Sequence, residues 1–292
     1  MREENKQMRI LSAIGIILVV AGHLGYSVLD VGGLFPYYSF HVFIFLFVSG
    51  YFYREEAEQQ LLRYIGKKCK ALLLPYFIWN LVYGILAVLL HRTGFSIGGE
   101  LTLWNLFIEP FVSGHQFLYQ FPAWFVPALF LIEVLNVLGR KVLSFLHLKK
   151  EWLIFAVSLL LGIATVALAK GGHVWGYYKF PGRLLFMMPG FQLGRIYKEK
   201  LENRVNKISD GRYFFVVVGV QLLTTICCRG LAFSAVWVTG FANAAFIPYL
   251  TVVTGIAFWL RISDWISRIP SACSWFMEIG RHTYAIMMHH VF

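Results

Sequence analysis

Long apolar stretches separated by short polar segments recur along the whole chain. Residues 10–29, 152–169 and 214–228 are typical of them. A helix needs roughly 17 to 25 mostly apolar residues to cross a bilayer, so each stretch predicts one membrane-spanning helix. The sequence therefore predicts an all-α fold, a polytopic transmembrane helix bundle with about nine to ten spans. The clearest spans are residues 10–29, 37–53, 71–90, 124–139, 152–169, 181–197, 213–228, 242–260 and 275–292.

No segment between these spans is long or polar enough to fold as a separate soluble domain. We therefore expect residues 1–292 to form a single transmembrane domain. The longest connection, 92–123, is rich in aromatic residues, and its apolar piece 101–112 predicts a half-helix at the membrane interface. Such a piece fits a lid over a cavity or an interfacial anchor equally well. The last span reaches the final residue of the sequence, which leaves open a natural end further on.

The composition excludes an ordinary soluble protein. Hydrophobic residues make up 58% of the chain and charged residues only 14%, whereas soluble domains carry about 25% charged residues. The net charge of +11 does not indicate nucleic-acid binding, because the basic residues fall between apolar stretches instead of on one solvated face. The four cysteines lack metal-ligand spacing, so no metal site is predicted.

The basic residues instead predict the orientation of the bundle. Alternate loops hold 17 of the 26 lysines and arginines, and the first nine residues hold three more. The opposite set of segments holds only six, among them Arg183 and Arg281. Because positively charged loops remain in the cytosol, the N-terminus is expected to be cytosolic. We expect a multi-pass protein of the cell membrane whose partners include lipid.

Three histidines in different spans are predicted to reach the same depth. At about 1.5 Å of rise per residue, His23 lies far along the first span, His41 near the start of the second and His290 near the end of the last. All three then fall in the outer half of the membrane, as does Arg183. Ionisable groups are costly inside a bilayer and usually mark a functional site. A single histidine is as easily an interhelical hydrogen-bond partner, but three at one depth favour a site.

His23 is the candidate general base of this site. A neutral, buried imidazole can accept a proton from a hydroxyl group. His41 and His290 are the candidates to orient His23 or to share the proton.

Basic residues at the inner ends of the spans form a second candidate site. Arg9 begins the first span, and four further cations precede the third. Positive side chains in such a position can bind the phosphates of a cytosolic ligand. They can also serve only to orient the protein or to bind anionic lipid headgroups. The four cations are Arg63, Lys67, Lys68 and Lys70.

Six segments resemble the motifs of membrane acyltransferase family 3, in the same order and over nearly the whole chain. The opening segment RILSAIGIILVVAGHLG (9–25) resembles the first helix of the family, in which a basic residue precedes a histidine by eleven positions. Here that position is Ser12, so Arg9, one turn earlier, would take the basic role. The remaining segments are FHVFIFLFVSGYFY (40–53), KKCKALLLPYFIWN (67–80), WFVPALFLIE (124–133), PGRLLFMMPGFQLG (181–194) and IGRHTYAIMMHH (279–290).

The resemblance implies an O-acyltransferase that moves an acyl group, usually acetyl or succinyl, from cytosolic acyl-CoA to a hydroxyl of a surface polysaccharide, a lipid-linked sugar or a related acceptor. It implies that acyl-CoA is the donor, that no metal is needed and that the protein lies in a bacterial plasma membrane. The family's closing histidine corresponds to His290 and not His289. The expected donor-binding residues are Arg9, Ser12, Arg63, Lys67, Lys68 and Lys70, and the expected acceptor-binding residues are Arg183, Trp124 and Glu133.

Two other classes of protein remain in view. A transporter or glycan exporter can use buried histidines as proton relays or substrate ligands. It would be expected to show paired, broken spans in two related halves, and no such internal symmetry is evident, although Pro127, Pro189 and Pro248 each interrupt a span. A sensor or scaffold without chemistry would leave the convergence of the histidines unexplained.

Overall fold

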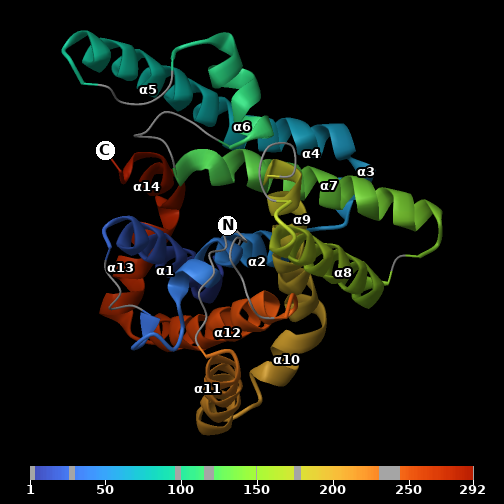
Figure 1. Ribbon diagram of the computed structural model, residues 1–292. Coiled ribbons are helices and arrows are strands. Elements are labelled where there is room, and N and C mark those ends of the chain that lie inside the picture. The colour runs from blue at the N-terminus through green and yellow to red at the C-terminus, as the bar shows by residue number, and fades with distance from the viewer. Residues whose placement is uncertain are drawn as a thin grey trace.

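The protein is described by a computed structural model that covers residues 4–25, 30–95, 100–114, 122–148, 150–173, 179–229 and 244–291. Within these ranges every regular element is a helix (Figure 1). The predicted all-α fold is confirmed.

The first two long helices differ from their predicted bounds for local reasons. Helix α1 (Lys6–His23) begins early because the side chain of Asn5 accepts a hydrogen bond from the Met8 amide at 3.0 Å and caps the helix. The predicted end of this span, 26–29, lies outside the described residues. Helix α2 (His41–Tyr51) begins late, because a 3₁₀ turn, η2 (Tyr37–Ser39), precedes it.

A single long helix follows the short helix α3 (Glu56–Gln59). It comprises α4 (Leu61–Lys68), a π-helical turn η3 (Cys69–Leu73) and α5 (Leu74–Arg92), and it begins ten residues before the predicted span. The expected half-helix appears as η4 (Trp104–Ile108) and α6 (Glu109–Val112). It lies against α5, where Asn80 Nδ2 donates a hydrogen bond to the Leu106 carbonyl at 2.7 Å.

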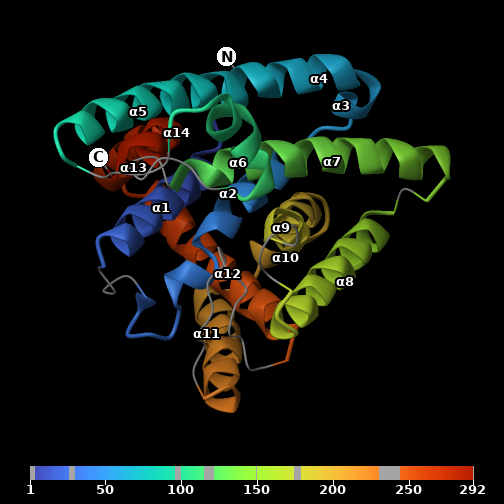
Figure 2. The same ribbon diagram turned by 45° about the horizontal axis from the view of Figure 1, so that its top comes forward.

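The rest of the described chain forms nine further elements, all helical. Figure 2 shows α7 running alongside the long α4–α5 helix, with α9 seen end-on beneath it. The elements are α7 (Phe125–Phe145), α8 (Glu151–Lys170), α9 (Lys179–Ile196), the π-helical turn η7 (Tyr197–Leu201), α10 (Glu202–Val205), α11 (Asp210–Cys227), α12 (Ile247–Ser267), α13 (Pro270–Arg281) and α14 (Thr283–His289).

The predicted count of nine to ten spans is not confirmed. Five described segments are long and apolar enough to cross a membrane, and α2 is a shorter apolar helix. Helices α9 and α12 have a similar length, but each carries charged residues along it, such as Arg183 and Arg261. The five segments are Lys6–His23, Leu61–Arg92, Pro122–Phe145, Glu151–Lys170 and Asp210–Cys227.

The predicted last span, 275–292, is wrong as a single helix. The chain breaks at His282, between α13 and α14. Helix α13 packs tightly on α1. The two backbones are so close at Gly280 that an added Cβ atom there would lie 2.6 Å from the Arg9 carbonyl oxygen. Arg281, which the loop count assigned to the opposite side, lies 3.5 Å from Glu4. It therefore belongs to the same end of the bundle as the N-terminus.

Helices α2 and α9 form the closest contact in the core. A Cβ atom at Gly50 of α2 would lie 1.9 Å from the Phe191 carbonyl oxygen of α9. Reciprocally, a Cβ atom at Gly194 of α9 would lie 1.9 Å from the Phe47 carbonyl oxygen of α2. Small residues let the two backbones touch, as is common between helices in membranes.

The bundle has two ends, which we name the N-terminal face and the histidine face. At the N-terminal face the start of α1 meets the end of α2, where Asn5 donates a hydrogen bond to Tyr51 Oη at 3.0 Å. Tyr51 in turn donates to Glu202 at the start of α10 at 2.8 Å. The histidine face is the opposite end, where α1 ends at His23.

Candidate functional site

His23 and His290 are in contact at the histidine face. Nδ1 of His23 lies 2.7 Å from Nε2 of His290, and the two rings stack with their centroids 4.8 Å apart. His290 Nδ1 lies 2.8 Å from the Ile286 carbonyl oxygen, which can only accept a hydrogen bond. In neutral imidazoles one nitrogen donates and the other accepts. His290 Nε2 must then accept from His23 Nδ1, which leaves His23 Nε2 as a free acceptor.

His41 lies near this pair but does not join its hydrogen bond. It is buried, and its Nδ1 lies 2.8 Å from the Tyr37 carbonyl oxygen. The Tyr37 ring packs on α1 at Gly22, where an added Cβ would approach it to 3.0 Å. The centre of the His41 ring lies 6.3 Å from that of the Tyr37 ring. The structure thus brings all three predicted histidines to one end of the bundle.

His289 points in another direction from its neighbour. Its Nδ1 lies 2.8 Å from Tyr83 Oη, and its ring lies 4.2 Å from the ring of Trp79, both on α5. This side chain faces α5, whereas His290 faces α1.

Two of the three predicted acceptor-binding residues lie together at the histidine face. The guanidinium carbon of Arg183 lies 4.6 Å from the centre of the Trp124 ring, and both side chains are buried. Residues beside Trp124 pack against Met288, next to His289 on α14. Figure 1 shows the corresponding arrangement, in which α7 begins beside α14 and passes the start of α9.

The third predicted acceptor residue, Glu133, lies elsewhere. It is buried on α7, more than two turns from Trp124, and accepts a hydrogen bond from Lys68 Nζ at 2.8 Å. The structure therefore groups Glu133 with the predicted donor-binding residues.

A cavity of about 590 Å³ opens among α2, α3 and α4. Arg63, Lys67 and Lys68 line it, and so does Arg54, which the sequence analysis did not select. Lys70 is exposed and does not belong to the lining. We call this space the basic cavity.

A second cavity, of about 220 Å³, adjoins the first. The two cavities share Val48 and Ser49 of α2 as lining residues. No charged residue lines this inner cavity, whose walls are mostly aliphatic and aromatic with four hydroxyl side chains, those of Ser12, Ser49, Thr283 and Tyr284.

Two residues that line the inner cavity lie on the helices that carry the histidine pair. Ser12 precedes His23 by eleven residues, which at about 100° per residue leaves the two on nearly the same side of α1. Thr283 precedes His290 by seven residues, or about two turns, on α14. The sides of α1 and α14 that line the inner cavity are therefore the sides that carry the two imidazoles further along each helix.

Arg9 does not line either cavity. Its guanidinium lies 2.6 Å from Glu4 and donates a hydrogen bond to the Gly280 carbonyl at 3.3 Å. Partial burial alone would raise the pKa of Glu4, but the hydrogen bond and charge of Arg9 and the charge of Arg281 lower it. A carboxylate thus already neutralises Arg9.

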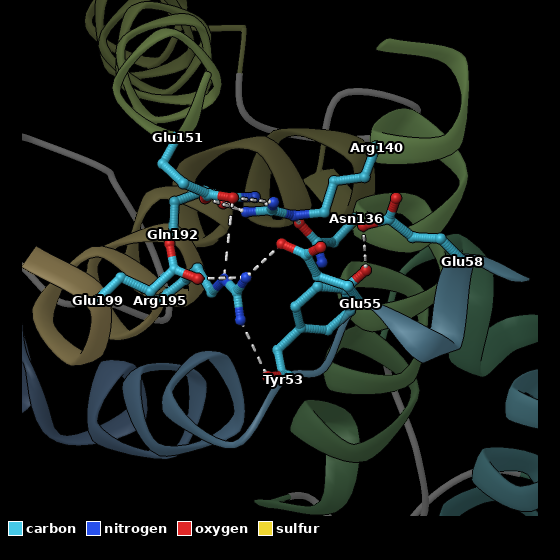
Figure 3. Close-up of polar contacts among 9 residues, drawn as sticks. All are labelled: Tyr53, Glu55, Glu58, Asn136, Arg140, Glu151, Gln192, Arg195 and Glu199. Atoms are coloured by element: carbon cyan, nitrogen blue, oxygen red, sulfur yellow. Dashed lines mark hydrogen bonds and ion pairs between the residues drawn. The ribbon is translucent and has the colours of Figure 1, made fainter. Parts of the chain in front are cut away.

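A buried polar network, drawn in Figure 3, joins five elements at the N-terminal face. Arg140 of α7 is fully buried and donates two hydrogen bonds of 2.6 Å to Glu151 of α8. It also bonds Asn136 at 3.1 Å and Gln192 at 2.8 Å. Arg195 of α9 continues the network to Tyr53, Glu55 and Glu199.

The comparison with known protein families decides between the classes of function. A family model described as an acyltransferase domain, acyltransferase family 3, matches residues 5–292. The chain belongs to this membrane acyltransferase family. No curated protein and no solved structure matches it. The acyltransferase domain thus comprises both cavities, the histidines and the buried network.

Three carboxylates of the acyltransferase come close enough to one another to suggest a cation site. The oxygens of Glu55, Glu151 and Glu199 lie within 4.8 Å of each other. Arg195 lies among them, 2.9 Å from Glu55, 3.8 Å from Glu151 and in an ion pair with Glu199. The guanidinium group already compensates these charges.

Sequence reasoning missed the buried network of the acyltransferase because its arginines resemble ordinary cytosolic loop charges. A usable signal was present in two amides, Asn136 and Gln192, which interrupt otherwise apolar segments. Polar groups inside a bilayer normally find partners, so these amides could have indicated Arg140 between them.

Proposed function

We propose that this protein is an integral membrane O-acyltransferase that moves an acyl group, acetyl by resemblance, from acyl-CoA on the cytosolic side to a hydroxyl of an extracytoplasmic glycan or lipid-linked sugar. One observation carries the proposal. Two adjoining cavities extend from a basic opening at the N-terminal face to residues of α1 and α14, the helices that carry the histidine pair at the other end.

The basic cavity suits the nucleotide part of acyl-CoA. Arg54, Arg63 and Lys67 are exposed at its walls, and Lys68 is held by Glu133. Several flexible cations around one opening fit a ligand with several phosphates. The N-terminal face would then be cytosolic, in agreement with the distribution of basic residues.

The inner cavity suits the pantetheine arm of the donor. This arm combines apolar methylene groups with amides, and the lining combines apolar side chains with hydroxyl groups. Buried amides need hydrogen-bond partners, which Ser49 and Thr283 can supply. The arm would carry the thioester toward His23.

At the thioester, His23 would act as the general base. Its free Nε2 takes the proton of the acceptor hydroxyl while the hydroxyl oxygen attacks the thioester carbonyl carbon. In the direct route the new C–O bond forms, the C–S bond breaks, and the proton passes to the leaving thiolate of CoA. The Ile286 carbonyl fixes the tautomer of His290, and His290 fixes that of His23.

The pair formed by Arg183 and Trp124 is the proposed contact for the acceptor. An aromatic ring beside a guanidinium offers both a stacking surface for a sugar and a hydrogen-bond donor. Glu133 is better placed to hold Lys68 than to contact the acceptor.

Binding of acetyl-CoA to the purified protein tests the proposal. We expect Arg63→Ala with Lys67→Ala to weaken binding strongly, because both residues line the basic cavity. Lys70→Ala is the matched control, since Lys70 is a neighbouring cation outside the lining. A transporter would ignore acetyl-CoA. Absence of binding, or equal loss in the control, would contradict the proposed donor site.

A further inference from the structure

Tyr53 connects the buried network with the basic cavity. It is buried at the end of α2, yet it is one of the residues that line the cavity, as is the adjacent Arg54. Arg140 and Arg195, which are not in the lining, are both directed at this ring.

Each contact to Tyr53 restrains it in a different way. The guanidinium carbons of Arg140 and Arg195 lie 5.1 Å and 5.5 Å from the ring centre. The Arg195 guanidinium donates a hydrogen bond to the Tyr53 carbonyl at 3.2 Å, and Tyr53 Oη donates to Glu58 at 2.9 Å. The ring, the backbone and the hydroxyl are therefore all fixed.

The two arginines are themselves held by one carboxylate. Glu151 accepts both hydrogen bonds of the Arg140 fork and lies 3.8 Å from Arg195 Nε. A bidentate pair sets the orientation of a guanidinium as well as its place. The position of Tyr53 thus depends on a residue of α8 that does not line the cavity.

We propose that Glu151, Arg140 and Arg195 are positioning residues for the donor: they hold Tyr53 and the segment that carries Arg54 in the shape that binds the CoA part of acyl-CoA. This inference rests on the proposed function of the basic cavity. The three residues act through Tyr53 and do not touch the ligand.

Glu151→Gln is the first test. The amide removes the charge and one of the two acceptor oxygens but keeps the shape of the side chain. Cation–π contacts are worth about 0.5 to 2 kcal/mol, so we expect the Kd of coenzyme A to rise about two- to thirtyfold. The kcat at saturating acetyl-CoA should stay unchanged, because the histidine face is untouched.

The chain offers a matched control at the same face. Arg261 stacks on Tyr213 at 4.3 Å and pairs with Asp210 at 3.2 Å, an arrangement of the same type that does not line either cavity. Asp210→Asn should leave the Kd of coenzyme A unchanged. An equal rise in both variants would show a general loss of structure and overturn the inference.

Tyr53 provides a second test that does not depend on the ion pairs. Tyr53→Phe keeps the ring and should bind coenzyme A nearly as well as the wild type, whereas Tyr53→Leu should repeat the Glu151→Gln effect. If the wild type binds coenzyme A and neither Glu151→Gln nor Tyr53→Leu weakens binding, this inference is wrong and the proposed function stands. If the wild type does not bind coenzyme A, both fall.

Discussion

The two ends of the bundle use polar groups in opposite ways. At the N-terminal face, charged side chains of neighbouring helices are buried in mutual ion pairs, as with Arg140 of α7 and Glu151 of α8. At the histidine face His290 uses both ring nitrogens, one toward His23 and one toward the Ile286 carbonyl, whereas the second ring nitrogen of His23 has no partner among the described residues and can accept a proton.

This difference indicates a division between stability and chemistry. A buried arginine that loses its carboxylate is left uncompensated, which strongly destabilises a fold. A histidine with one hydrogen bond can be replaced at little structural cost, but its capacity to exchange protons is lost. Removal of a charge from the buried network should therefore lower stability and, through Tyr53, donor affinity, whereas substitution of His23 should affect turnover.

The largest expected effect is on catalysis. His23→Ala should lower acetyl transfer by about 10² to 10⁴-fold, the range of a lost general base. The variant should insert into the membrane and resist unfolding as the wild type does. His289→Ala is the control, because this neighbouring imidazole faces Tyr83. Mass analysis of surface glycans from cells producing each variant measures the outcome. Retained acetylation in His23→Ala would remove this residue from the mechanism.

The next effect is on folding at the opposite end. Arg140→Met should lower the free energy of unfolding by about 3 to 5 kcal/mol, because Glu151 loses its buried partner. Lys141→Met changes the neighbouring, exposed cation of α7 and should have little effect. Denaturation in detergent, followed by helix content, compares the two. Equal stability would show that the network is not structural.

A smaller loss is expected in the core between the two ends. Gly194→Ala should cost about 1 to 3 kcal/mol, since the new methyl group would overlap the Phe47 carbonyl oxygen. At Gly219 of α11 an added Cβ meets nothing within 4 Å, so Gly219→Ala should be neutral or stabilising. The Tm should fall in Gly194→Ala and stay the same or rise in Gly219→Ala. An equal shift of the Tm in both variants would argue against the close contact.

The smallest effect concerns the proposed acceptor contact. Trp124→Leu removes the ring beside Arg183, and the loss of about 0.5 to 2 kcal/mol should raise the KM for the acceptor about two- to thirtyfold. The Kd of acetyl-CoA should not change. Trp152→Leu replaces an exposed tryptophan of α8 and serves as the control. A change in the Kd of acetyl-CoA, with the KM for the acceptor unchanged, would show that Trp124 contributes to donor binding and not to acceptor binding.

Helix geometry and motif order indicated much of this architecture from the sequence. The rise of an α-helix predicted one depth for His23, His41 and His290, and the structure places them at one end. The family assignment from ordered motifs is confirmed. Both inferences depend on local periodicity, which a single sequence displays directly.

The features that escaped prediction depend on tertiary packing. The break at His282 comes two residues after Gly280, where α13 packs against Arg9 of α1, and a single sequence does not display that contact. Arg140 and Glu151 are only eleven residues apart, yet their burial requires α9 beside them. Arg9 was expected to meet a ligand phosphate, and the structure pairs it with Glu4.

The unbroken helix from Leu61 to Arg92 has a mechanical consequence. Its 32 residues extend about 48 Å, whereas the hydrocarbon core of a bilayer is about 30 Å thick. The excess length is accommodated by tilt or by projection beyond the lipid. Helix α4 carries one wall of the basic cavity. A change in bilayer thickness that alters the tilt of the long helix would therefore move that wall. Reconstitution in lipids of different chain length should thus change how well the basic cavity binds its ligand.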